Sequence, residues 1–107
     1  MTNEQTRNEQ FRAAIEEITA VVRKHPGTGG GQVLMKILIS LAFRVQVPID
    51  LGAVSYHFGS RGESATRNAT LVAISNRAMC NWPDDILPDD EIRGWISHWK
   101  IPYDDMW

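Results

Sequence analysis

Cysteine and long apolar runs are almost absent from this sequence. Cys80 is the single cysteine in 107 residues, so an intrachain disulfide is excluded, and a lone cysteine is most often a small buried apolar residue. The longest apolar stretch, residues 33–45, is interrupted by Lys36 and Arg44 and is too short to span a bilayer. The N-terminal residues are polar and lack an apolar leader. We therefore expect a soluble, cytoplasmic protein that makes no membrane contact.

A strong excess of charge is also missing. The 11 basic and 13 acidic residues give a net charge of −2, whereas dedicated nucleic-acid binders usually carry a clear basic excess. The charges are nevertheless unevenly distributed, because residues 32–79 carry a net charge of +3 and residues 80–107 a net charge of −5. A binding partner would therefore meet a weakly basic middle and an acidic C-terminal part.

No combination of residues typical of catalysis is present. The histidines, His25, His57 and His98, are too far apart in sequence for a local metal motif, and the pairs of adjacent aspartates lie in turns or at a helix start. The glycine-rich segment 27–31 lacks the lysine and hydroxyl residue that close a phosphate-binding loop, so it predicts a flexible connector whose end starts the second helix. We expect no enzymatic activity, no catalytic residues, no metal and no cofactor.

What the sequence does contain is helical periodicity, with apolar residues at spacings of three and four. Helices are expected over residues 4–24, 31–45, 51–58, 64–79 and 88–100. The second is apolar on nearly all sides, which is typical of a buried helix. In the fourth, Leu71 and Ile74 are expected to widen the apolar face. The sequence thus predicts an all-α fold: one compact domain, residues 1–107, of four to five helices around the helix at about 31–45, with an extended tail at about 100–107.

Four tryptophans lie close together in the acidic C-terminal part. Two of them share one face of the last helix with apolar neighbours, so packing against the central helix is one interpretation. The other is a protein interface, because exposed aromatic side chains with an acidic rim are typical anchors for a basic partner. On this second interpretation the partner-binding residues are Trp82, Trp95, Trp99, Tyr103 and Trp107.

The segment SYHFGSRGE, residues 55–63, resembles the end of the recognition helix and the following turn of TetR-family repressors. The resemblance implies that this segment contacts the phosphate backbone of DNA. The nucleic-acid-binding residues would then be Tyr56, His57, Arg61 and Arg67. Upstream the sequence departs from the family, because FRVQVPID contains a proline and no glycine where the family has a tight turn. The alternative is that Val54, Tyr56 and Phe58 fill a core.

A longer segment, from Thr28 to Val54, resembles a small family of accessory proteins of plasmids, phages and integrative elements. The matching residues are Thr28, Gly29, Leu38, Ile39, Leu41, Pro48, Ile49, Asp50 and Leu51. They describe a polar start, an apolar helix, a breaker and a helix cap. The resemblance implies a helical fold and an origin on a mobile element, and it brings no activity with it.

These observations predict a small non-enzymatic binding protein that docks onto another protein. Inhibition of a host defence protein or nucleic-acid-handling protein would suit its size and its acidic aromatic end. Formation of a homodimer is left as a further possibility. The alternative is a small helix-turn-helix DNA-binding regulator, which would use the nucleic-acid-binding residues given above.

Overall fold

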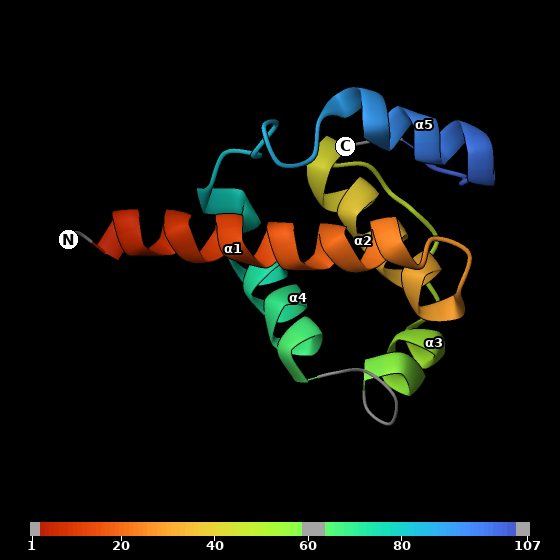
Figure 1. Ribbon diagram of the computed structural model, residues 1–107, viewed down its shortest axis with the longest axis horizontal. Coiled ribbons are helices and arrows are strands. Elements are labelled where there is room, and N and C mark those ends of the chain that lie inside the picture. Colours follow the sequence, from red (N-terminus) through yellow and green to blue (C-terminus); the bar gives the residue numbers. More distant parts are fainter. Residues whose placement is uncertain (1–2, 59–63, 105–107) are drawn as a thin grey trace.

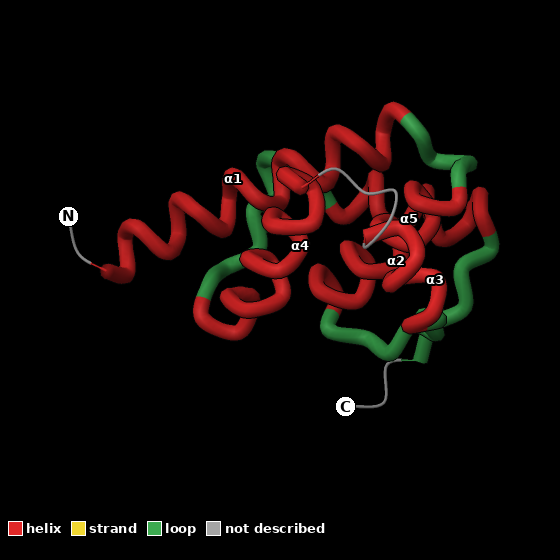
Figure 2. The backbone as a smooth tube through the Cα atoms, turned by 90° about the horizontal axis from the view of Figure 1, so that it is seen from below, coloured by secondary structure: helices red, strands yellow, loops and turns green. Residues whose placement is uncertain are grey.

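The computed structural model describes residues 3–58 and 64–104, which form five α-helices and one short 3-10 helix. The elements are α1 (Asn3–Lys24), α2 (Gly29–Phe43), α3 (Leu51–Tyr56), α4 (Ser64–Asn76), η2 (Arg77–Met79) and α5 (Asp89–Trp99) (Figure 1). Only helices and loops are seen among the described residues in Figure 2. The predicted all-α fold is therefore confirmed. None of the described helices is both long enough and apolar enough to cross a membrane.

α1 runs across the molecule and packs against α4 and α2 (Figure 1). Its inward face follows the expected helical spacing and consists of Phe11, Ala14, Ile15, Ile18, Thr19 and Val22, all of which are buried. The first turns of α1 extend beyond the other helices (Figure 1). The buried face therefore begins only at Phe11.

α2 is buried along most of its length, as expected for the central helix. Its buried residues are Gly31, Val33, Leu34, Met35, Ile37, Leu38 and Ile39. The helix starts at Gly29, two residues earlier than expected, because Thr28 Oγ1 caps it by accepting a hydrogen bond of 3.0 Å from the backbone N–H of Gly31. The end of segment 27–31 starts the second helix, as expected, and its last three residues, Gly29, Gly30 and Gly31, already belong to the first turn of α2.

α3 is short and has no buried residue. Asp50 caps it, with Oδ1 accepting a 2.9 Å hydrogen bond from the N–H of Gly52. Tyr56 is 52% exposed, so the alternative in which Tyr56 fills the core is wrong. Phe58, two residues further on, does pack against the core cluster. The segment therefore turns one aromatic ring outward and the next one inward.

α4 packs against α1 through small side chains: Ala69, Thr70 and Ala73 are buried. The expectation that Leu71 and Ile74 widen this buried face is wrong, because they are 56% and 51% exposed. Successive helix residues are rotated by about 100°, so Leu71 lies about 160° around the helix from Ala69 and points away from α1. Val72 of α4 also packs against the core cluster, whereas Leu71 and Ile74 face outward.

The C-terminal segment returns over the core after η2. Cys80, Leu87, Ile92 and Ile101 are buried in the main hydrophobic cluster. α5 begins one residue later than expected, at Asp89, because Pro88 has extended backbone and occupies the cap position. After α5, an isolated antiparallel bridge pairs Gln46 with Asp104, so residues 101–104 lie along the connection between α2 and α3.

Candidate functional site

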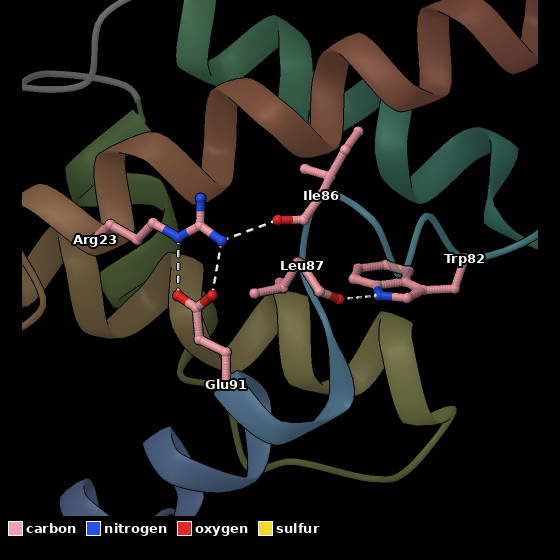
Figure 3. Close-up of polar contacts among 5 residues, drawn as sticks. All are labelled: Arg23, Trp82, Ile86, Leu87 and Glu91. Atoms are coloured by element: carbon pink, nitrogen blue, oxygen red, sulfur yellow. Dashed lines mark hydrogen bonds and ion pairs between the residues drawn. The ribbon is translucent and has the colours of Figure 1, made fainter.

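Trp82, the first of the predicted partner-binding residues, is held by contacts within the fold. Its indole N–H donates a 3.0 Å hydrogen bond to the carbonyl oxygen of Leu87 (Figure 3). Its ring meets Phe11 edge to face with 6.3 Å between ring centroids, and the guanidinium of Arg77 lies 5.6 Å from its ring centroid. An indole has one hydrogen-bond donor, and here that donor is already used. Packing therefore accounts for Trp82.

The other described members of the predicted partner-binding surface are also engaged, with one exception. Trp95 and Trp99 are half-buried against the core cluster, and Trp99 covers Gly27, where an added Cβ would lie 3.4 Å from its ring. Tyr103 is the exception, at 47% exposed. Trp107 lies outside the described residues. The packing interpretation therefore explains both tryptophans of α5.

Arg23 fastens the C-terminal segment to α1. Its Nε and Nη2 donate to the two carboxylate oxygens of Glu91 at 2.8 and 2.6 Å, and Nη2 also donates to the carbonyl of Ile86 at 2.9 Å (Figure 3). The hydrogen bonds that Arg23 donates to the carboxylate of Glu91 raise the pKa of Arg23. Planar guanidinium and carboxylate groups suit this paired geometry. The first turn of α5 is thus tied to the last turn of α1.

A second ion pair joins α1 to the turn before α5. Arg12 Nη1 and Nη2 donate to the carboxylate oxygens of Asp85 at 3.0 and 2.6 Å. This hydrogen bonding is the main reason why the pKa of Asp85 is lowered. Together with Arg23 and Glu91, the pair explains why acidic residues of the C-terminal part lie beside α1. Two acids are therefore used for intramolecular contacts.

A concave site lies where α1 ends and where α2 and α4 begin. We call it the corner pocket; it has a volume of about 500 Å³. Its described lining residues are Ala20, Val21, Lys24, His25, Thr28, Gly30, Gly31, Leu34, His57, Phe58, Thr66 and Arg67. Sites for small molecules usually span about 300–1,000 Å³. The corner pocket is therefore large enough for a small molecule or for one side chain of a partner.

Basic side chains dominate the polar part of the corner pocket. Lys24, His25, His57 and Arg67 line it, and its described lining includes no acidic residue. Lysine and arginine are charged at neutral pH. Within the described part of the chain, the side chains of Lys24, His25 and His57 make no hydrogen bond or ion pair. The electrostatic potential of this pocket is therefore expected to be positive.

The N-terminal ends of two helices, α2 and α4, also lie at the pocket. Gly30 and Gly31 belong to the first turn of α2, and Thr66 to the first turn of α4, where the helix dipole is positive. The C-terminal end of α1 would oppose them, but the carbonyl of His25 already accepts hydrogen bonds from the N–H and the hydroxyl of Thr28. At the start of α2, the N–H of Gly31 is likewise already donated to Thr28 Oγ1.

An apolar wall completes the corner pocket. Val21, Leu34 and Phe58 supply it, and Leu34 is only 3% exposed. Arg67 Nη1 donates a 3.1 Å hydrogen bond to the carbonyl of Phe58, which joins the start of α4 to the segment after α3. The pocket thus combines a basic rim with an apolar wall.

His57 lies directly over the first turn of α2. A Cβ added to Gly29 would lie 2.9 Å from His57 Nε2, and one added to Gly30 would lie 3.5 Å from His57 Nδ1. The glycines are therefore the reason why the imidazole approaches the helix so closely. The ring also meets Tyr56 edge-on, with 5.2 Å between ring centroids.

The predicted nucleic-acid-binding residues are only partly brought together. His57 and Arg67 both line the corner pocket, Tyr56 is exposed and is absent from its lining, and Arg61 lies outside the described residues. Sequence reasoning missed Lys24, His25 and Thr66 as members of the same site. They come from helix ends that are distant in sequence, and no motif links them.

The connection before α3 differs from that of a helix-turn-helix unit. Residues 44–50 separate α2 from α3, whereas helix-turn-helix units use a turn of about three to four residues. α3 itself has 6 residues, and a π-helical turn continues it through residues 57–58, where the described segment ends. The described geometry therefore gives no support for insertion of α3 into a DNA groove.

No family model, no curated protein and no solved structure matches this chain. Within residues 3–58 and 64–104, no group of three or more His, Cys, Asp or Glu side chains is arranged to hold a metal ion. The function is therefore inferred from the geometry and charge of the corner pocket.

Proposed function

We propose that the protein is a small non-enzymatic binding protein whose binding site is the corner pocket. The observation that carries this proposal is the convergence of four basic side chains, with no acidic residue in the described lining, around a cavity of about 500 Å³. An apolar wall and a few convergent polar groups are the usual features of a ligand site. The ligand would carry an anionic group attached to an apolar body.

The charge of the pocket supports an anionic ligand. An anion is attracted to positively charged side chains, and the attraction is stronger where water is partly excluded. Lys24 reaches the pocket from α1 and Arg67 from α4, and both are charged at neutral pH. An anion bound in the corner pocket would therefore be attracted by both side chains.

Protein docking through the Trp-rich end is the second candidate. The exposure of Tyr103, which lies beside a second hollow formed with Val47, Pro48 and Pro102, favours it. Trp82, Trp95 and Trp99 support it less, because packing within the domain already accounts for them. The mobile-element origin and the inhibition of a host protein stay predictions.

An NMR titration tests the proposed function. We expect aromatic carboxylates, sulfates or phosphates to shift the backbone amide signals of residues 20–31, 57–58 and 66–67, and neutral analogues to leave them unchanged. Lys24→Gln should weaken the affinity at least tenfold, because it removes one of the two permanent charges of the pocket.

Arg7→Gln is the matched control. It removes the same charge from the same helix, about 25 Å from Lys24 along the helix axis. Its affinity for the anions should equal that of the unsubstituted protein. The proposal is wrong if no anion shifts the pocket signals, or if both variants weaken binding equally.

A further inference from the structure

We infer that the outward face of α4 is a contact surface between two copies of this chain, which pair through α4 in antiparallel orientation. The face consists of Asn68, Leu71, Ile74 and Ser75, all of which are exposed, and we call it the outer α4 face. This inference goes beyond the proposed function, because none of the four residues lines the corner pocket.

The outer α4 face carries large apolar side chains. Leu71 is 56% exposed and Ile74 is 51% exposed, whereas the buried residues of the same helix are the smaller Ala69, Thr70 and Ala73. Successive helix residues are rotated by about 100°, so the four members of the outer α4 face lie within an arc of about 120°. A surface helix normally turns its polar side to the solvent. α4 instead has apolar side chains on both sides.

The outer α4 face also lacks charge. Residues 64–79 contain no acidic residue, and their two basic residues are Arg67 and Arg77. Both guanidinium groups donate to backbone carbonyl oxygens, from Arg67 to Phe58 at 3.1 Å and from Arg77 to Leu41 at 2.7 Å. No member of the outer α4 face is itself charged. This side of the molecule is therefore apolar with only uncharged polar neighbours.

The lack of charge favours a second copy of this chain as the partner. Two different proteins recognise each other largely through complementary charges, and the outer α4 face offers none. In a pair with two-fold symmetry, the same surface of each copy lies at the axis. A charge at the axis would therefore meet a like charge. An uncharged apolar face avoids this repulsion and is complementary to itself.

The position of Arg67 favours antiparallel helices. In a parallel pair, the two copies of Arg67 would lie side by side. In an antiparallel pair about an axis near residue 73, they are separated by about 18 Å along the helix, which exceeds the screening length of about 8 Å at physiological salt. The same arrangement places Leu71 opposite Ser75 of the second copy. A large side chain thus faces a small one, as interdigitated packing requires.

The size of the contact predicts a weak dimer. A standard protein interface buries about 800 Å² on each partner. α4 has 13 residues and is therefore about 20 Å long, so one face of it offers less area than that. We expect the dimer to form at high protein concentration and to dissociate on dilution.

Sedimentation equilibrium of the full chain, from low to high micromolar concentration, tests the inference. The average mass should rise from that of one chain towards that of two. Leu71→Glu should weaken the association at least tenfold, because each copy would bring a carboxylate into the apolar contact. Leu51→Glu is the matched control, since it makes the same change at a leucine of α3 that is 78% exposed. This control should associate like the unsubstituted protein.

Two results would overturn the inference. One is the mass of a single chain at every concentration. The other is equal weakening by Leu71→Glu and Leu51→Glu, which would indicate unspecific apolar association. Circular dichroism checks that each variant is folded. Leu71→Ser, which removes the apolar side chain without adding a charge, replaces Leu71→Glu if that variant does not fold.

Disulfide cross-linking tests the orientation of the two helices. In the antiparallel pair, the two copies of residue 74 lie about 3 Å apart along the helix axis, and the two copies of residue 68 about 15 Å apart. Only the first separation is compatible with a disulfide. Ile74→Cys should therefore oxidise to a covalent dimer and Asn68→Cys should not, and the native Cys80 is buried. Cross-linking of Asn68→Cys as fast as that of Ile74→Cys would overturn the antiparallel pairing.

Discussion

Gly31 lies so close to His25 that a β-carbon at position 31 would overlap the carbonyl oxygen of His25. The obstacle is backbone, so a side-chain rotation could not relieve it. The same carbonyl accepts two hydrogen bonds from Thr28, which caps α2. The end of α1 and the start of α2 are therefore packed against each other at their backbones.

Gly31→Ala is expected to destabilise the protein by about 3 kcal/mol, because one of the two backbones must move. Chemical denaturation checks this value. Gly94→Ala is the matched control, since a Cβ at Gly94 would meet no atom within 4 Å in an exposed part of α5. The control should raise stability by about 1 kcal/mol through helix propensity. Equal effects of the two substitutions would contradict the backbone contact.

Gly29→Ala is expected to displace His57 and to leave the fold intact. The added methyl group would meet the imidazole at 2.9 Å, and a side chain can move away where a backbone cannot. The ring proton signals of His57 should shift in NMR spectra, and binding of aromatic anions in the corner pocket should weaken. Unchanged His57 signals would show that the imidazole does not cover the first turn of α2.

Thr19→Val is expected to stabilise the protein by about 1 kcal/mol. Thr19 is fully buried, and its hydroxyl has no hydrogen-bond partner among the described residues. A buried hydroxyl without a partner carries a desolvation cost that an isosteric methyl group avoids. Thermal and chemical denaturation check this prediction. Thr70→Val is the control and should destabilise, because the hydroxyl of Thr70 donates a 2.8 Å hydrogen bond to the carbonyl of Thr66. A loss of stability in Thr19→Val would contradict the prediction.

Asp85 is expected to make stability depend on pH in the acid range. Hydrogen bonding to Arg12 lowers the pKa of Asp85 below the ordinary value of 3.8. Its contribution to stability is therefore present above that ordinary value and is lost as the pH falls through the lower native pKa. Asp85→Asn should flatten the acid limb of the stability curve, as should Arg12→Gln. A steeper acid limb in either variant would contradict the pairing.

Helical periodicity was enough to predict the all-α fold and the buried faces of α1 and α2. It works there because both helices are long and their apolar residues recur in register, as from Phe11 to Val22. It failed on α4, where Leu71 and Ile74 have the right spacing but are exposed, whereas Ala69 and Ala73 are buried. Spacing specifies that residues share a face, and the neighbouring helix decides which face is covered.

The corner pocket could not be predicted in the same way. Lys24 ends one helix, Thr66 lies in the first turn of another, and His57 follows a third. Each is unremarkable in its own segment, and only the angles between helices bring them together. The YHF segment did draw attention to His57, but for a DNA contact that the described connection between α2 and α3 does not support. The partner-binding role expected for Trp82 likewise depended on exposure, which the hydrogen bond to Leu87 and the contact with Phe11 reduce.

The two ion pairs on α1 fix the register of the C-terminal segment along that helix. Arg12 and Arg23 are three helical turns apart, so they share one side of α1 at a separation of about 16 Å. Their partners, Asp85 and Glu91, flank the buried Leu87. If the segment shifted by one helical turn along α1, both ion pairs would break and Leu87 would leave its buried position. The segment and α1 should therefore open as one cooperative unit, with matched rates of amide hydrogen exchange.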